Sequence, residues 1–258
     1  MKPHMSPGHL FLASLGKTRL RPGGKTATER ILTSCRITEH SHVLEVAPNM
    51  GTTAIEVASR YGCRVTGVDL HAPSLDKAKE NVRQHGLEEQ VRLVIGNAMA
   101  LPFPDNSFDV VINEAMLTML TYEQKQQAVS EYLRVLKPGG RLATHDLLLQ
   151  QEPDTETVKQ RLNELRKAIY VNAQPMTAAK WEELFRQAGF GEVVCVTGNM
   201  SLLSLKGLIV DEGWEGMIRI LSNAMQSEDD RQRLFRLINL FDESSDLYGH
   251  ITCVSTKA

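Results

Sequence analysis

Between residues 43 and 149 the sequence alternates short, β-rich apolar runs with segments of helical periodicity. The first pair is a run at 42–47 followed by a helical segment at 52–61, which Thr52 or Thr53 can cap. Strict alternation of this kind predicts parallel strands with helices on both faces, and right-handed crossovers make the sheet doubly wound. The further strands are expected at 64–68, 91–95, 108–112 and 141–148, with helices from Pro73 to Gly86 and at 123–136, the latter ended by Pro138-Gly-Gly140.

The second half of the chain continues the pattern less regularly. Helices are expected at 155–169 and 177–188, and strands at 192–196 and 250–255. About fifty residues separate these two strands, which is too many for a hairpin turn, and their periodicity is helical. The sequence therefore predicts one α/β domain over 1–258, with a seven-stranded, mostly parallel sheet and a helical insertion at 199–246 between the last two strands.

Charge and cysteine spacing exclude several classes of protein. The net charge is −2, so nothing suggests nucleic acid or an anionic membrane as the main partner, and no apolar run reaches the ~18 residues of a membrane span. The four cysteines form no CxxC and have no nearby CxxH, which predicts no metal site and no disulfide framework. With no visible signal peptide, we expect a cytoplasmic protein with reduced thiols.

Three short motifs follow three successive expected strands. The first, Val43-Leu-Glu-Val-Ala-Pro-Asn-Met-Gly51, opens a helix where open α/β sheets bind ligands, although only the last of three glycine positions carries glycine. The second is Gly67-Val-Asp69, whose carboxylate can accept both ribose hydroxyls of a nucleoside, and the third is Gly96-Asn97-Ala98. Taken singly, each has a structural alternative: a tight turn, a helix cap and a turn asparagine.

Two further segments, Leu101-Pro-Phe-Pro-Asp-Asn-Ser-Phe-Asp-Val-Val111 and Leu133-Arg-Val-Leu-Lys-Pro-Gly-Gly140, complete the series. Together with the three motifs, they resemble the class I S-adenosylmethionine-dependent methyltransferases of the small-molecule, quinone-methylase-like group. The resemblance covers roughly residues 40–149, and 177–258 more loosely. It implies the Rossmann-like methyltransferase fold and methyl transfer from S-adenosylmethionine to a small molecule, with S-adenosylhomocysteine as the product.

The resemblance also assigns residues. It implies that Glu45 orients the loop and the methionine amino group, and that Ala47, Asn49 and Gly51 lie in the loop under the methionine moiety. Asp69 would hold the ribose. The remaining cofactor contacts implied by the resemblance are Leu70, Asn97 and Ala98 around the adenine, and Asn113 near the methionine tail.

Methyl transfer needs a general base only if the acceptor must lose a proton. The candidates are Glu114, His145 and Asp146, which lie at or near the carboxyl ends of the fourth and fifth expected strands. For His145 and Asp146 the alternative is a structural hydrogen-bonded pair.

Two additions to the core are expected to recognise the acceptor. The N-terminal segment 1–35 contains a basic stretch that would lie over the pocket, where its cations could neutralise an anionic acceptor or remain solvated. The insertion 199–246 would be either a lid, with Met200, Leu202, Leu203, Trp214 and Met217 as an apolar ceiling, or the interface of a homodimer. A dinucleotide-dependent oxidoreductase and a non-catalytic S-adenosylmethionine-binding protein are the alternative functions.

Overall fold

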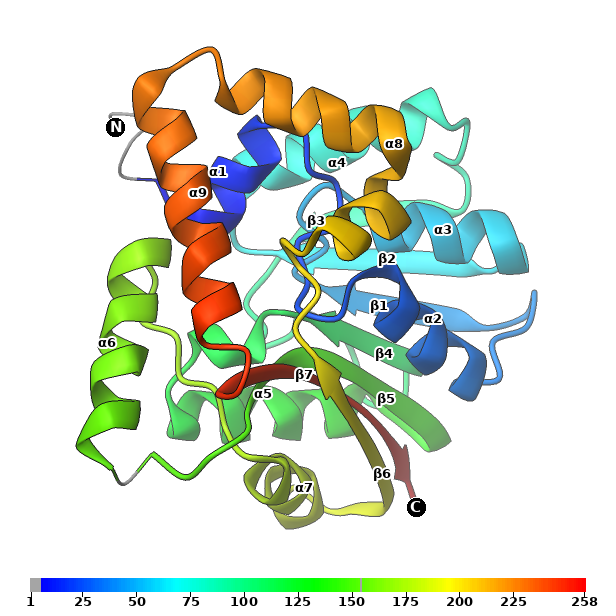
Figure 1. Ribbon diagram of the computed structural model, residues 1–258. Coiled ribbons are helices and arrows are strands. Elements are labelled where there is room, and N and C mark those ends of the chain that lie inside the picture. Colours follow the sequence, from blue (N-terminus) through cyan, green and yellow to red (C-terminus); the bar gives the residue numbers. More distant parts are fainter. Residues whose placement is uncertain (1–5, 154) are drawn as a thin grey trace.

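The computed structural model describes residues 6–153 and 155–258, which form a single seven-stranded sheet (Figure 1). The strand order is β3-β2-β1-β4-β5-β7-β6, in which β7 runs in the opposite direction to the other six strands. This is the doubly wound, mostly parallel sheet that the alternating pattern predicts. The strands are β1 (His42–Val46), β2 (Arg64–Asp69), β3 (Val91–Ile95), β4 (Phe108–Glu114), β5 (Leu136–Leu149), β6 (Phe190–Asn199) and β7 (Tyr248–Lys257).

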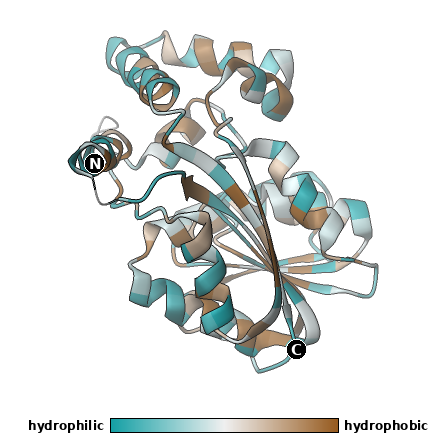
Figure 2. Ribbon diagram, turned by 60° about the horizontal axis from the view of Figure 1, so that its bottom comes forward, coloured by the Kyte–Doolittle hydropathy of each residue, from teal (hydrophilic) through white to brown (hydrophobic). Residues whose placement is uncertain are grey.

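Two apolar cores hold helices against the two faces of the sheet. On one face α2 (Gly24–Ser34), α3 (Thr52–Tyr61) and α4 (Ala72–Gln84) pack over strand residues such as Val43 and Ile112. On the other face α5 (Tyr122–Val135) and α7 (Ala178–Gln187) pack over residues such as Leu44 and Val111. Because side chains alternate along a strand, neighbouring residues of β1 and of β4 serve opposite cores. Figure 2 shows hydrophobic residues along the strands and on parts of the helices that surround them.

Two local expectations are wrong. Neither Thr52 nor Thr53 caps α3: the N-cap is Gly51 in the left-handed region, and both threonine hydroxyls donate elsewhere, to Thr18 O and to Glu114. Pro138-Gly-Gly140 also does not separate helix from strand, because β5 already begins at Leu136, directly after α5. The irregularity there is a register shift between β4 and β5.

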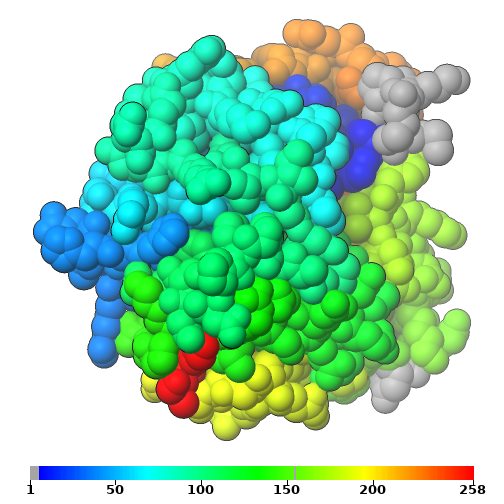
Figure 3. Space-filling model, turned by 180° about the vertical axis from the view of Figure 1, so that it is seen from behind, coloured from blue at the N-terminus to red at the C-terminus, as the bar shows by residue number. Residues whose placement is uncertain are grey.

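Helices from both ends of the chain pack together beside the carboxyl edge of the sheet. The short α1 (Gly8–Ser14) contributes Phe11 and Leu12, and its C-cap residue Leu15 joins them, in an apolar cluster with α8 (Leu205–Ala224) and α9 (Glu228–Glu243). We call these three helices the cap. From behind, the blue N-terminal segment is enclosed between the orange residues of α8 and α9 and the yellow-green α6 (Glu156–Ile169) (Figure 3).

The helical insertion therefore lies between β6 and β7, as predicted, but one of its residues does not belong to an apolar ceiling. Trp214 is 64% exposed on the outer side of α8, just after a break in the helix at Gly213. Leu203 and Met217 pack inside the cap, and only Met200 and Leu202 face a cavity, described below.

The cysteine expectation needs a correction. Cys195 and Cys253 lie directly opposite each other on the antiparallel strands β6 and β7, and they form a disulfide with a Cα–Cα distance of 4.1 Å. The two cysteines are 58 residues apart, so a short spacing motif could not have predicted that they pair. Cys35 and Cys63 are free and buried. Among the described residues, no helix is both long and apolar enough to cross a membrane.

Candidate cofactor and acceptor sites

A cavity of about 500 Å³ lies where the carboxyl ends of β1, β2 and β4 meet. This volume falls in the range of small-molecule sites. Of the residues expected to bind cofactor, Glu45, Ala47, Asn49 and Asp69 line it, and so does the catalytic candidate Glu114. Parallel strands with a switch in strand order produce such a crevice, because the chain leaves β1 toward one side and β4 toward the other.

The loop after β1 forms one wall of this cavity. Ala47, Asn49 and Gly51 all have positive φ, at 57°, 51° and 76°. These are the three positions that a full glycine fingerprint would occupy, so the chain keeps the backbone path without two of the glycines. The Ala47 N–H donates to Val68 O, which ties the loop to β2. A Cβ atom at position 51 would lie 3.2 Å from the Ala78 side chain of α4.

Two carboxyl groups in this cavity fit a nucleoside with an amino-acid tail. Glu45 is 3% exposed, and its Oε2 has no hydrogen-bond partner among the described residues. Burial raises the pKa of Glu45 to about 8, although Arg21 opposes the shift. Such a carboxyl group is suited to a cationic ligand, which would supply the missing partner. Asp69 ends β2, and its Oδ1 accepts a hydrogen bond from the His71 N–H at 2.9 Å.

Five other residues expected to contact the cofactor do not line this cavity. Leu70 is 65% exposed, and the Asn97 Oδ1 accepts from the Met99 N–H in a turn, at 3.0 Å. Asn113 is fully buried on the opposite face of β4, toward Tyr132 of α5. Gly51 ends the loop and lies against Ala78 of α4, and Ala98 packs against the core that includes Leu44 and Val111. Contacts of these five with a cofactor stay predictions.

Glu114, at the end of β4, is contacted by four side chains from four different segments of the chain. Its Oε1 accepts from Thr28 of α2 at 2.5 Å and from His145 Nδ1 at 3.0 Å, and its Oε2 accepts from Thr53 of α3 at 2.8 Å. Arg21 completes the set with an ion pair at 3.0 Å to Oε2. Burial by itself would raise the pKa of Glu114, but Arg21 and His145 outweigh it and lower the pKa to about 2. The carboxylate is therefore held ionised.

His145 and Asp146 occupy opposite sides of β5 and do not form a pair with each other. The Gly23 N–H donates to His145 Nε2 at 2.9 Å, so this imidazole uses one nitrogen as acceptor and donates from the other to Glu114. Asp146 accepts from the Thr118 and Leu147 N–H groups, at 3.2 and 2.8 Å. Burial raises the pKa of Asp146, against the effect of these hydrogen bonds and of Lys125. Both imidazole nitrogens of His145 are engaged within the protein.

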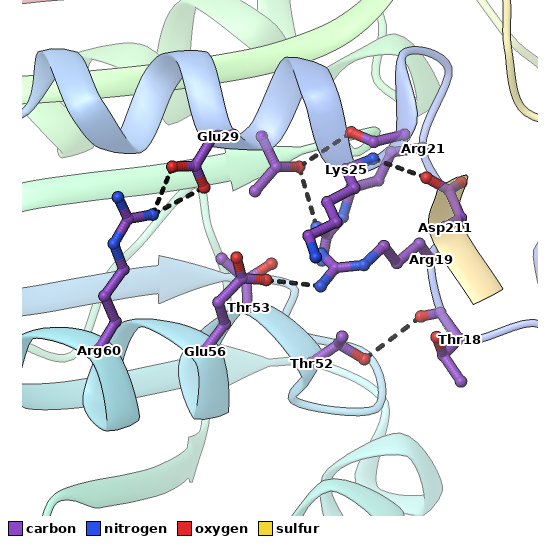
Figure 4. Close-up of polar contacts among 12 residues, drawn as sticks. Thr18, Arg19, Arg21, Lys25, Glu29, Thr52, Thr53, Glu56, Arg60 and Asp211 are labelled. Carbon is purple, nitrogen blue, oxygen red and sulfur yellow. Dashed lines mark hydrogen bonds and ion pairs between the residues drawn. The ribbon is translucent and has the colours of Figure 1, made fainter. Parts of the chain in front are cut away.

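Three cations of the basic N-terminal segment are paired within the protein, whereas the Lys25 side chain is exposed. Lys17 is fully buried between Asp211 and Glu212 of α8, at 3.1 and 3.4 Å. Figure 4 shows that Arg19 pairs with Glu56 of α3, and that the Lys25 N–H donates to Asp211. Residues 16–24, which we call the strap, thus join the cap to the core. The Cβ of a non-glycine residue at Gly24 would lie 2.4 Å from Asp211, so the close approach requires glycine there.

A second, apolar cavity of about 110 Å³ lies beside the first, between the strap and the cap. We call it the chamber. Four residues line both cavities: His9, Leu20, Ala115 and Met119. The two spaces therefore meet at a shared wall. Asp146 lines the chamber but not the first cavity, whereas Glu114 lines the first cavity but not the chamber.

Sequence reasoning missed several of these residues. His9 carries no motif, and only the folding of α1 against the strand ends brings it to the shared wall. Thr28 and Thr53 are ordinary helix residues whose hydroxyl groups meet Glu114 only in the folded chain. Arg21 stands in the noted basic stretch, but nothing local indicates that its partner is Glu114.

Comparison with known proteins gives a consistent picture. A family model described as a methyltransferase domain matches residues 43–140. An uncharacterised protein of Haemophilus influenzae is 50% identical over 250 residues, covering 97% of this chain and 98% of that protein. Methyltransferase GfsG of Streptomyces halstedii is 33% identical over 51% of this chain, which spans 46% of that relative.

A solved structure of phosphoethanolamine N-methyltransferase 2 from Haemonchus contortus, in complex with phosphomonomethylethanolamine and S-adenosylhomocysteine, has the same fold. Its TM-score is 0.73 at 21% identity, over 92% of this chain and 53% of that one. The family match runs from β1 to the first residues of β5, and so includes β1, β2 and β4, whose carboxyl ends form the first cavity. Residues 43–140 therefore belong to the methyltransferase domain family, and the chain has the fold of the class I S-adenosylmethionine-dependent methyltransferases.

Proposed function

We propose that this protein transfers a methyl group from S-adenosylmethionine to a small-molecule acceptor. The observation that carries the proposal is the pair of adjoining cavities, one with carboxyl groups at strand ends and one almost wholly apolar. When bound, the cofactor supplies an electrophilic methyl group on a sulfonium. The chain has only to position the two ligands and exclude water.

In this proposal Asp69 binds the ribose and Glu45 binds the methionine ammonium group over the loop 47–51. An ammonium ion supplies the charge that the buried Glu45 carboxyl group lacks. Glu114 holds the strap over the cofactor rather than taking a proton, because its four contacts keep it ionised at any ordinary pH. We further propose that segments 1–35 and 199–246 act together as the cover of the site; the first five residues lie outside the described range.

The strap gives no support to an anionic acceptor. Lys17, Arg19 and Arg21 are all paired with carboxylates of the protein itself. A bound anion would compete with these carboxylates for the same cations. We therefore propose an uncharged acceptor.

Calorimetric titration with S-adenosylhomocysteine tests the cofactor assignment. We expect the Asp69→Asn variant to bind about 10- to 100-fold more weakly than the parent, since hydrogen bonds to a charged group contribute about 1.5–3 kcal/mol. Asp76→Asn is the matched control, because Asp76 is an exposed aspartate of α4 whose ion pair is with Lys79. Equal affinity in all three proteins would show that Asp69 does not hold the ribose.

Two further measurements separate the alternative functions. If NADH binds and S-adenosylhomocysteine does not compete with it, the protein is a dinucleotide-dependent enzyme and our proposal is wrong. Incubation with methyl-labelled S-adenosylmethionine and a metabolite extract then tests turnover. Tight cofactor binding without transfer of label to any metabolite would favour a non-catalytic binding protein.

A further inference from the structure

The chamber between strap and cap is built almost entirely from apolar side chains. Of its lining residues only His9, Thr118 and Asp146 are polar. The rest come from α1, α6, α9 and the segments beside them, and include Leu12, Leu165, Val171, Met200, Leu237 and Phe241. Such a surface offers little to a charged or zwitterionic molecule, because a polar group moved there from water loses its hydrogen bonds.

The size of the chamber limits what it can hold. Its volume of about 110 Å³ is of the same order as the ~150 Å³ apolar cavity that accepts benzene in an engineered protein. A single ring is therefore about the largest group that it can hold. A steroid or macrolide skeleton exceeds this space several-fold.

His9 stands at the wall that the two cavities share. Its imidazole makes no hydrogen bond within the part of the chain that the structure describes. Burial lowers the pKa of His9, while Asp69 has a smaller opposing effect, so the ring is neutral at pH 7 and offers one nitrogen as acceptor. A ring-sized ligand in the chamber would direct one substituent past this nitrogen toward the first cavity.

Asp146 lines the chamber but not the first cavity. Both of its oxygens already accept backbone N–H groups, so it needs no cation from a ligand. A carboxyl group in this position disfavours a second carboxylate or a phosphate on the acceptor. It agrees with an uncharged ligand.

We propose that the chamber binds the acceptor, and that this acceptor is an apolar molecule of about one ring whose hydroxyl group donates a hydrogen bond to His9. The inference rests on the proposed function and specifies its substrate class. The inference depends on the wall that the two cavities share. If the cofactor occupies the first cavity, an acceptor in the chamber can reach the methyl group only at this wall.

Saturation-transfer NMR on the full chain with S-adenosylhomocysteine tests the proposal with three probes. We expect p-cresol to bind with a dissociation constant on the order of 1 mM or better, toluene to bind about 2- to 10-fold more weakly, and phosphoethanolamine not to bind. In His9→Ala the preference for p-cresol over toluene should disappear. In His71→Ala it should persist, because His71 lines only the first cavity.

Variants of Val171 locate the bound probe. Val171→Phe fills the chamber and should weaken p-cresol at least 10-fold, whereas Val210→Phe, on the exposed face of α8, should leave it unchanged. Val171→Ala enlarges the chamber, and should shift the preference from p-cresol toward 4-propylphenol. If Val171→Phe does not fold, Val171→Ala still tests whether the probe binds in the chamber.

The outcomes separate the two proposals. If S-adenosylhomocysteine binds but p-cresol does not, or if p-cresol binds equally well to the Val171 variants, the inference about the acceptor is wrong and the proposed function stands. If phosphoethanolamine binds in place of p-cresol, the acceptor is polar and the inference is again wrong. If S-adenosylhomocysteine itself fails to bind, the proposed function fails.

Discussion

At the scale of single residues, the first cavity holds two buried glutamates in opposite states. Glu114 receives hydrogen bonds and an ion pair from four side chains, and its pKa falls to about 2. Glu45 is equally buried, but its Oε2 has no partner among the described residues, and its pKa rises to about 8. The two residues share the Arg21 cation, so charge on one disfavours charge on the other. The difference between them comes from donors that other elements supply.

Glu45 should therefore make the stability of the ligand-free protein depend on pH. Its pKa is about 8 in the folded chain against 4.5 ordinarily, so between these values the folded chain holds a proton that the unfolded chain releases. The free energy of unfolding should fall as pH rises through this window, by at most about 1.4 kcal/mol per pH unit. Urea unfolding at pH 5.5 and 7.5 measures this fall.

Glu45→Gln should lose that component of the pH dependence, because the amide does not titrate. Glu88→Gln, the same change at an exposed position, should keep it. An unchanged pH dependence in Glu45→Gln would mean that Glu45 is ionised in the folded protein.

At the scale of elements, the strap is the connection between cap and core. The Asp211–Glu212 pair at the middle of α8 accepts the Lys17 ammonium group and the N–H groups of Thr18 and Arg19. On the core side, Arg19 reaches Glu56 of α3. Most of these groups are buried, and a buried charge that loses its partner is costly. The position of α8 over the site thus depends on charges from the other end of the chain.

Replacing Lys17 tests this connection. In Lys17→Met two carboxylates stay buried without their cation, and we expect a loss of about 3 kcal/mol with faster amide exchange in residues 16–24 and in α8. Lys25→Met is the control, because Lys25 contributes only its backbone N–H to Asp211 and its side chain is exposed. Hydrogen exchange with mass spectrometry gives the local readout. Parental exchange rates in Lys17→Met would show that apolar packing alone holds the cap.

At the scale of the whole molecule, Glu114 joins parts of the chain that are far apart in sequence. Its carboxylate links β4 to the strap, to α2 and to α3. It also accepts a hydrogen bond from His145 of β5, and the imidazole of His145 in turn accepts one from the Gly23 N–H. The N-terminal segment, the first helical layer and the centre of the sheet therefore meet at one charge. Glu114 and Arg21 also line the first cavity.

Glu114→Gln should weaken the molecule as a whole. The Gln amide nitrogen would replace one of the two carboxylate oxygens. It would then face the donors of Arg21 and Thr53 at one position, or those of Thr28 and His145 at the other. In either case Arg21 would lose its charge partner. We expect a loss of about 3–5 kcal/mol in the free energy of unfolding. Asp109→Asn on the same strand removes a partly exposed pair with Lys137 and should cost about 1 kcal/mol. Equal losses in the two variants would contradict this role of Glu114.

The sequence by itself determined the layered fold. Alternating periods of about two and 3.6 residues fix which segments are strands and which are helices, and chain handedness then leaves one winding of the sheet. The ends of β1 and β2 could also be predicted to carry ligand-binding groups, and Glu45, Ala47, Asn49 and Asp69 do line the cavity. These features are local, because each depends on a few neighbouring residues.

Tertiary structure decided whatever depends on contacts between distant segments. The opposed positions of Cys195 and Cys253, the outward direction of Trp214 and the placing of Leu70 and Asn97 away from the cavity follow from register and packing. The partners of Lys17 and Glu114 are of the same kind, since the first lies 194 residues from Asp211 and the second 86 residues from Thr28. The sequence pattern predicts on which face of its own helix or strand a side chain lies. Its partner and its pKa depend on the other elements that pack against that face.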